Sequence, residues 1–284
     1  MAKSLYVSFY MMLAMAITVF AVRELIATQD YLTWGGVLLT TVPFLLVISW
    51  VMIFKNIART SARFPTLIVM ALIGVIFATR SYVLHANEIA PVLAGLGFLG
   101  FLAYDYWYSS FDRGSDQLQV GQTLPGFELT DTSGHTVTST SLSDKPTVWI
   151  FYRGNWCPLC MAQIKELVAL YQQLEELGVR VALVSPQPAN FTKKLANKFD
   201  VAFDFLADED NRAARALGIA SPNGIPAGMQ MLGYDSETVL PTVIITAAGG
   251  RILWVHETDN YRVRPEPETY LAVLRDNRLL DSAE

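Results

Sequence analysis

The chain is poor in cysteine and histidine, and these shortages exclude several classes of protein. Its 284 residues include two cysteines and three histidines. Two cysteines cannot cross-link a small secreted domain, which depends on several disulfides. A structural zinc ion takes about four ligands, more than two cysteines and scattered histidines supply. We therefore expect no bound metal ion.

Basic residues are not concentrated as a nucleic-acid-binding protein would need. Up to Asp112 there are six Lys or Arg residues against five Asp or Glu, and the remainder has 15 against 21. The second part of the chain is therefore acidic. A protein that binds nucleic acid presents a clustered basic face, so we expect no nucleic-acid partner.

The first part of the chain contains four long apolar runs with almost no charge. Most approach the ~20 residues that cross a hydrocarbon layer of about 30 Å, which predicts a lipid bilayer as partner. An aromatic cluster at the end of the fourth run is typical of the headgroup level. A cleaved signal peptide is the alternative for the first run, and a buried soluble helix for a shorter one. The runs cover residues 5–22, 35–54, 64–79 and 89–107.

Lys and Arg residues near these runs predict the orientation in the membrane. With four spans and the N-terminus inside, most of the basic residues fall on the inner side. We expect an integral protein of a bacterial inner membrane, with its C-terminal part in the cytoplasm; an odd number of spans would reverse this. The inner residues are Lys3, Lys55, Arg59, Arg63 and Arg113, and the outer ones Arg23 and Arg80.

The composition predicts three regions: a four-helix transmembrane domain over residues 1–110, a polar linker over 111–119, and a second domain over 120–284. In the second domain, strand-like runs alternate with helical ones, and a late hairpin and a last helix follow. This order favours an α/β fold with a mixed central sheet flanked by helices. The expected strands are 127–130, 136–138, 146–152, 179–185, 203–206, 238–246 and 251–256, and the expected helices 158 to about 177, 190–199, 213–217 and 266–278.

Both cysteines stand together in the segment Trp156-Cys157-Pro158-Leu159-Cys160, between a predicted strand and a predicted helix. Such a pair suits dithiol–disulfide chemistry, in which one thiol attacks and the other resolves the mixed disulfide. Unpaired N–H groups at a helix start favour a thiolate, so we expect Cys157 to attack with a lowered pKa and Cys160 to resolve. The redox group is then the Cys157–Cys160 disulfide, without another cofactor. Two buried cysteines that serve only in packing are the plainer alternative.

Residues 151–160 read FYRGNWCPLC, which resembles the peroxiredoxin-like members of the AhpC/TSA group, in the redoxin branch of the thioredoxin superfamily. Segments 121–131, 185–186, 206–208 and 240–242 share the likeness, which runs from about residue 119 to the end. The resemblance implies a thioredoxin-like fold and an enzyme that reduces protein disulfides or hydroperoxides with electrons from an external thiol reductant. It also implies that Pro241, before Thr242, is a cis-proline that faces the pair and leaves a backbone edge free for a substrate chain.

Three residues beside the cysteines are candidates for supporting roles. Pro158 suits the first position of the helix. Trp156 is a candidate cover for the disulfide, with ordinary packing as the alternative. Arg153 is a candidate to stabilise a thiolate or orient a peroxide oxygen, with a solvent-facing charge at a strand end as the alternative.

The chain departs from its relatives at three positions. Peroxiredoxins carry a Pro and a Thr or Ser where this chain has Ile150 and Gly154, which weakens a carry-over of fast peroxide reduction. Thioredoxins bury an acid where this chain has Phe151, which removes the usual proton acceptor for the resolving thiol.

A membrane-tethered thiol–disulfide oxidoreductase is thus the leading hypothesis. One alternative is a thioredoxin-fold copper chaperone, in which the two thiolates and His256 hold Cu(I). The other is a redox-sensing membrane assembly factor that changes partner when the disulfide forms.

Overall fold

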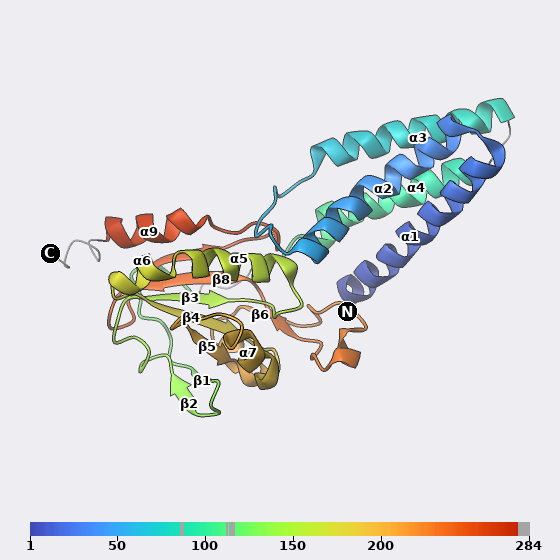
Figure 1. The fold of residues 1–284 in the computed structure, drawn as a ribbon. Coiled ribbons are helices and arrows are strands. Elements are labelled where there is room, and N and C mark those ends of the chain that lie inside the picture. The colour runs from blue at the N-terminus through green and yellow to red at the C-terminus, as the bar shows by residue number, and fades with distance from the viewer. Residues whose placement is uncertain (86–87, 112, 114–116, 278–284) are drawn as a thin grey trace. The chain divides into compact units, whose positions relative to one another are not determined.

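The computed structural model describes residues 1–85, 88–111, 113 and 117–277, and Figure 1 shows its helices and strands. The chain divides into two compact units. The helical unit consists of Ala2–Phe54 and Ser61–Ser110, and the α/β unit of Met1, Lys55–Thr60 and Phe111–Glu284. The segment Lys55–Thr60 thus belongs to the α/β unit although it connects two helices of the helical unit.

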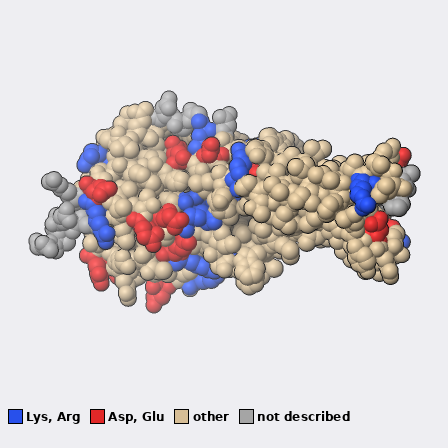
Figure 2. Space-filling model, turned by 90° about the horizontal axis from the view of Figure 1, so that it is seen from above, with Lys and Arg blue, Asp and Glu red and all other residues tan. Residues whose placement is uncertain are grey.

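The helical unit contains four helices that are long and apolar enough to cross a membrane. The four predicted apolar runs correspond one to one to these helices, and the third run begins one residue before its helix. On the face shown in Figure 2, the helices carry almost no Lys, Arg, Asp or Glu away from their ends. The helices are α1 (Ala2–Thr28), α2 (Tyr31–Phe54), α3 (Pro65–His85) and α4 (Ile89–Leu102), and a π-helical turn, Ala103–Tyr108, continues the last.

Small residues bring the backbones of these helices close together. A Cβ atom added to Gly36 on α2 would lie 2.7 Å from the carbonyl oxygen of Gly74 on α3, so neither position has room for a larger residue. Ala78, Ala90 and Ala94 are fully buried between the helices. Close contact of this kind is the main source of attraction between helices in lipid.

The α/β unit is built on a seven-stranded sheet in the order β2-β1-β5-β4-β3-β8-β9. Strands β3, β4 and β5 are parallel, β8 pairs with β3 in the antiparallel sense, and β9 pairs with β8 in the antiparallel sense. This is the predicted mixed sheet, and it has the thioredoxin-like arrangement. The strands are β1 (Glu128–Thr130), β2 (Thr136–Thr138), β3 (Thr147–Phe151), β4 (Arg180–Ser185), β5 (Asp204–Ala207), β8 (Thr242–Thr246) and β9 (Ile252–Glu257).

Helices cover both faces of this sheet (Figure 1). The Gln163 amide on α5 donates a 3.0 Å hydrogen bond to the Tyr270 hydroxyl on α9, so these two helices share one face. The helix α7 covers the other face in Figure 1. The helices are α5 (Pro158–Ala169), α6 (Tyr171–Glu176), α7 (Ala189–Ala196), α8 (Arg212–Ala216) and α9 (Pro267–Asp276).

The central strand β3 positions the cysteine pair. All five of its residues are buried, as its continuous apolar sequence predicts. Its last residue, Phe151, lies between Val184 on β4 and Thr242 on β8. The loop that leads to Cys157 therefore starts at the centre of the sheet edge, with structure on both sides.

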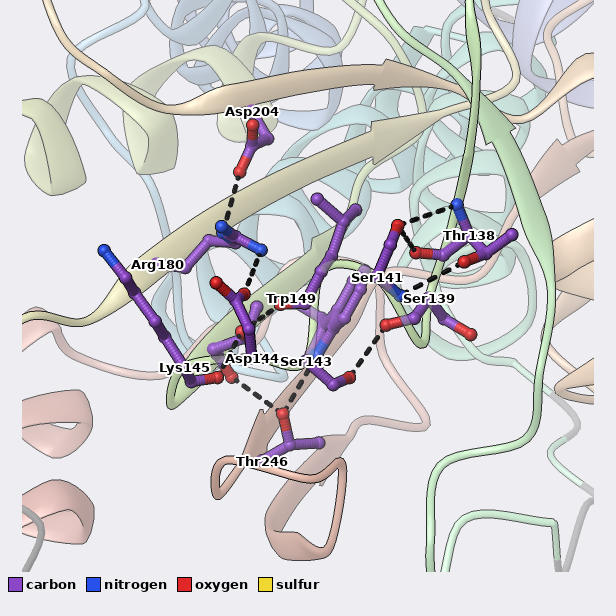
Figure 3. A network of polar contacts seen from close by, with 12 residues as sticks. Thr138, Ser139, Ser141, Ser143, Asp144, Lys145, Trp149, Arg180, Asp204 and Thr246 are labelled. Atoms are coloured by element: carbon purple, nitrogen blue, oxygen red, sulfur yellow. Dashed lines mark hydrogen bonds and ion pairs between the residues drawn. The ribbon is translucent and has the colours of Figure 1, made fainter.

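Polar contacts fix the opposite end of the same strands (Figure 3). The indole N–H of Trp149 donates to the Thr246 hydroxyl at 3.2 Å, which ties β3 to β8. Arg180 at the start of β4 forms ion pairs with Asp144 at 2.7 Å and with Asp204 on β5 at 3.3 Å. Burial raises the pKa of Asp204, and the positive charge of Arg180 opposes that rise. The pairs hold the register of adjacent strands far from the cysteines.

Two predicted elements are interrupted. The strand expected at 238–246 divides into β7 (Thr238–Val239) and β8, because Pro241 has no N–H to donate. The first piece instead pairs with β6 (Ala220–Ser221) in a separate two-stranded sheet. The helix expected from 158 to about 177 is broken at Leu170 into α5 and α6. The last helix is expected to reach Arg278, which lies outside the described residues.

Candidate active site

The cysteine pair lies at the start of α5. Cys157 is the N-cap residue and Pro158 occupies the first helical turn, where its missing N–H costs nothing. The backbone N–H of Cys160 donates to Sγ of Cys157 at 3.3 Å. The structure therefore places the first cysteine at the helix terminus and the second one turn inside, and both are free thiols.

The two thiols are almost inaccessible. Cys157 is 2% exposed and Cys160 is 1% exposed. The fold around them is that of a closed, reduced pair. A substrate larger than a peroxide reaches either sulfur only when the first turn of α5 or the loop before it moves.

Burial and positive charge act in opposite directions on the pair, whose thiols are linked by a hydrogen bond. Burial raises the pKa of the Cys157 thiol, and Cys160 beside it raises it further. Burial also opposes ionisation of Cys160, but its pKa is lowered to about 6 by the hydrogen bond from Cys157 and by the positive charges of Arg264 and Arg153. The prediction that Cys157 has the lowered pKa is therefore wrong for this closed state, in which burial and Cys160 raise the Cys157 pKa.

Arg153 lies between the strand β3 and the pair, in the loop that both share. Its guanidinium stacks on the ring of Trp156 at 4.6 Å and lies 5.5 Å from the ring of Tyr261. It also donates to the carbonyl of Gly224. The side chain is buried, so the alternative of a solvent-facing charge is wrong, and its charge reaches both sulfurs.

Trp156 packs over this loop, where its indole N–H donates to the Arg153 carbonyl at 3.1 Å. The indole also occupies the space beside Gly154, where an added Cβ would lie 2.8 Å from it. Gly154 has φ +134°, a conformation that disfavours side chains. The hydroxyl residue of peroxiredoxins therefore has no room at this position, which bears on peroxide reduction.

Pro241 is not a cis-proline: the described part of the chain contains no cis peptide bond, so that implication of the resemblance is wrong. Its carbonyl is also occupied, since Nη2 of Arg113 donates to it at 2.7 Å. Nη1 of Arg113 donates to the Thr242 hydroxyl at 3.2 Å and pairs with Glu257 at 3.1 Å. The backbone edge at Pro241 is thus held by Arg113, near the start of the main stretch of the α/β unit.

A second cationic residue, Arg264, lies behind the pair. It lines a small hollow with Phe151, Gln163 and Pro241, and this hollow is too narrow for a water molecule. Arg264 is 5% exposed, and within the described residues its Nε and Nη2 atoms have no hydrogen-bond partner. The charge of Arg264 favours the ionised form of both thiols.

His256 lines the same hollow. Burial, together with the charges of Arg264 and Arg113, lowers its pKa to about 4, so the imidazole is neutral near pH 7. Within the described residues, no three His, Cys, Asp or Glu side chains gather into a group that could hold a metal ion.

A polar cluster that the sequence did not reveal holds the loop before Cys157. The Gln187 side chain accepts from the Asn155 backbone N–H at 2.8 Å, and its amide donates to the hydroxyls of Tyr152 at 3.1 Å and of Thr192 at 3.2 Å. The Tyr234 hydroxyl donates to the Asn155 side chain. Burial raises the pKa of Tyr152, and so does the nearby Cys160, which places this cluster beside the second sulfur.

Residues 120–255 match the AhpC/TSA family. Peroxiredoxin Q of Triticum aestivum is 31% identical over 125 residues, which cover 44% of this chain and 58% of that protein. The putative peroxiredoxin bcp of Helicobacter pylori is 30% identical over 99 residues, or 35% of this chain and 65% of that protein. The thiol-disulfide oxidoreductase ResA of Bacillus cereus is 27% identical over 158 residues, or 55% and 78%.

The chain spans less than two thirds of the length of these peroxiredoxin relatives. The match covers the sheet and the helix that carries the pair, and it leaves out the helical unit. The sheet order and the strand-to-helix turn agree with it. The match over residues 120–255 agrees with the resemblance seen in the sequence and supports a redoxin of the thioredoxin superfamily.

Proposed function

We propose that this chain is a membrane-anchored thiol–disulfide oxidoreductase that cycles between the dithiol and disulfide forms of Cys157 and Cys160. The observation that carries the proposal is the geometry of the pair. Its first sulfur accepts the Cys160 backbone N–H at 3.3 Å, and buried guanidinium groups act on both sulfurs. A helix terminus and nearby cations are what a reactive thiolate needs.

In this proposal Cys160 takes the proton from Cys157. The lowered pKa of Cys160 favours a state in which the Cys157 thiol keeps its proton and donates a hydrogen bond to Cys160. Transfer of that proton creates a Cys157 thiolate, which the Cys160 backbone N–H and the helix terminus stabilise.

Reduction of a substrate disulfide then takes two exchanges. The Cys157 thiolate attacks one substrate sulfur, forms a mixed disulfide and releases the other as a thiolate. The Cys160 thiol gives its proton to the substrate thiolate released in the first exchange, attacks Cys157 and releases the second substrate thiolate. Two electrons pass from the pair to the substrate, and an external dithiol returns them by the same exchange in reverse.

Hydroperoxide is the second candidate oxidant, because the relatives include peroxiredoxins. Attack of Cys157 on the peroxide would release an alcohol and leave a sulfenic acid, which condenses with Cys160 and releases water. This chain has Gly154 where peroxiredoxins carry a Thr or Ser, and the absence of that hydroxyl favours a disulfide over a hydroperoxide as substrate. Comparing turnover of the full-length chain with a protein disulfide and with a hydroperoxide decides between them.

The same assay tests the enzyme proposal as a whole. Purified full-length chain, supplied with dithiothreitol, should lose turnover when Cys157 is replaced by Ser. Cys160→Ser should instead accumulate a mixed disulfide with the substrate. Equal turnover in the wild type and Cys157→Ser would overturn the proposal.

We further propose that the α/β unit faces the cytoplasm. The segment Lys55–Thr60, in the connection between α2 and α3, belongs to that unit. The α/β unit is therefore on the same side of the bilayer as this connection. This segment carries Lys55 and Arg59, and Arg63 follows it; basic residues of this kind mark cytoplasmic loops. A thiol reagent that cannot cross membranes should label the pair only after cells are permeabilised, and equal labelling of intact cells would reverse the orientation.

A further inference from the structure

The segment Lys55–Thr60 packs into the α/β unit against the helix that carries the cysteine pair. The Thr60 N–H donates to the Arg262 carbonyl at 3.0 Å. Lys165 on α5 donates from Nζ to the Lys55 carbonyl at 3.2 Å. Ala58 in the middle of the segment is 2% exposed. This six-residue segment of the connection between α2 and α3 is therefore held by contacts at both of its ends.

Arg59 makes the strongest of these contacts. Its Nη1 atom lies 3.0 Å from Glu266, the N-cap residue of α9, and its Nη2 atom pairs with Glu166 on α5. One guanidinium thus binds carboxylates on two helices, so the basic segment and the acidic surface match in charge. Both Arg59 and Glu166 are partly shielded from water, which strengthens the pair over a fully exposed one.

These contacts bear on the chemistry because α5 begins at the pair. Lys165 and Glu166 lie on the helix that Cys157 caps, and Gln163 ties the same helix to Tyr270 on α9. Since both sulfurs are buried, a protein disulfide reaches them only through motion of this helix or of the loop before it. Whatever holds α5 in place therefore also limits access to the thiols.

We infer that the face made by Glu166 on α5 and Glu266 at α9 is a docking surface for the chain's own segment Lys55–Thr60, which restrains opening of the dithiol. The inference deepens the proposed function and rests on it only in taking the pair as the reactive group. A segment that joins two membrane-type helices thereby governs how often a client disulfide meets the thiols. Release of Arg59 opens the site without any change in the residues that carry out the chemistry.

The test measures how fast a fluorescent maleimide labels the reduced pair in the purified full-length chain, in detergent. The variants R59Q, E166Q and R59Q/E166Q form a double-mutant cycle. E166Q should be labelled about threefold faster than the wild type, as expected for loss of one partly exposed ion pair, and R59Q, which also loses the pair with Glu266, at least as fast as E166Q. The double variant should be no faster than R59Q. The control E268Q removes another acidic residue of α9 and should be labelled at the wild-type rate.

Two results would overturn the inference: single variants labelled at the wild-type rate, or a double variant whose acceleration is the product of the two single ones. If R59Q does not fold, E266Q removes the second carboxylate and must by itself accelerate labelling. Labelling needs no turnover, so these outcomes are independent of the enzyme assay. If the enzyme assay shows no turnover but the labelling rates of the variants follow the expected pattern, only the proposed function is refuted.

Discussion

Replacing Arg264 by glutamine should make the dithiol less acidic and its disulfide less oxidising. The Cys160 pKa of about 6 depends on the hydrogen bond from Cys157 first and on the charge of Arg264 next. Arg264 is buried beside a hollow that admits no water, so solvent does not screen its charge. Removal of one such charge shifts a pKa by about 1 unit, which corresponds to roughly 1.4 kcal/mol of thiolate stability.

The loss of thiolate stability also shifts the equilibrium between the dithiol and disulfide forms of the pair. Arg264 stabilises the reduced, ionised pair. Its removal should therefore lower the equilibrium constant for reduction by glutathione about tenfold, which corresponds to a reduction potential lower by roughly 30 mV. The assay follows the thiolate absorbance of the full-length chain against pH, and the disulfide fraction in glutathione buffers. Arg264→Lys should retain most of the effect, and Arg275→Gln, on the exposed side of α9, should have none. An unchanged absorbance midpoint in Arg264→Gln would refute the argument.

Three further predictions concern stability and packing. The His256 pKa of about 4 lies below its ordinary value, so its contribution to stability is present above about pH 6.5 and is lost as the pH falls towards 4. In denaturant titrations at several pH values, His256→Asn should therefore reduce the loss of unfolding free energy at acid pH by at most about 3 kcal/mol. The same loss in the variant and the wild type would contradict this. Gly154→Ala should destabilise the fold by about 1–3 kcal/mol and displace Trp156, which a changed tryptophan emission would show and an unchanged one exclude. Arg113→Met leaves the Glu257 carboxylate without its ion pair and should cost about 2 kcal/mol; a melting temperature equal to the wild type would count against that role.

Local signals in the sequence are enough to predict the parts that depend on few distant contacts. Hydropathy runs mark the four long helices because each must be apolar along its length. The central strand is recognisable because β3 is buried on both faces. The start of α5 follows from Pro158 and the spacing of the apolar residues after it.

The remaining features depend on residues that meet only in the fold. Arg264 lies far from Cys157 in sequence, and nothing local distinguishes it from a surface arginine, so the charge behind the pair was missed. Arg113 was assigned to a polar linker although it binds the Pro241 carbonyl. The break at Pro241 and the separate pairing of Val239 with Ala220 depend on a partner strand that a hydrophobic pattern does not identify.

The most direct test of the central claim is peptide mass mapping of the full-length chain after incubation with an oxidised protein substrate. We predict that one cross-linked peptide, lighter by two hydrogen atoms, joins Cys157 to Cys160, and that dithiothreitol restores two alkylatable thiols. A chain that keeps both thiols free while the substrate disulfide stays intact would contradict the account.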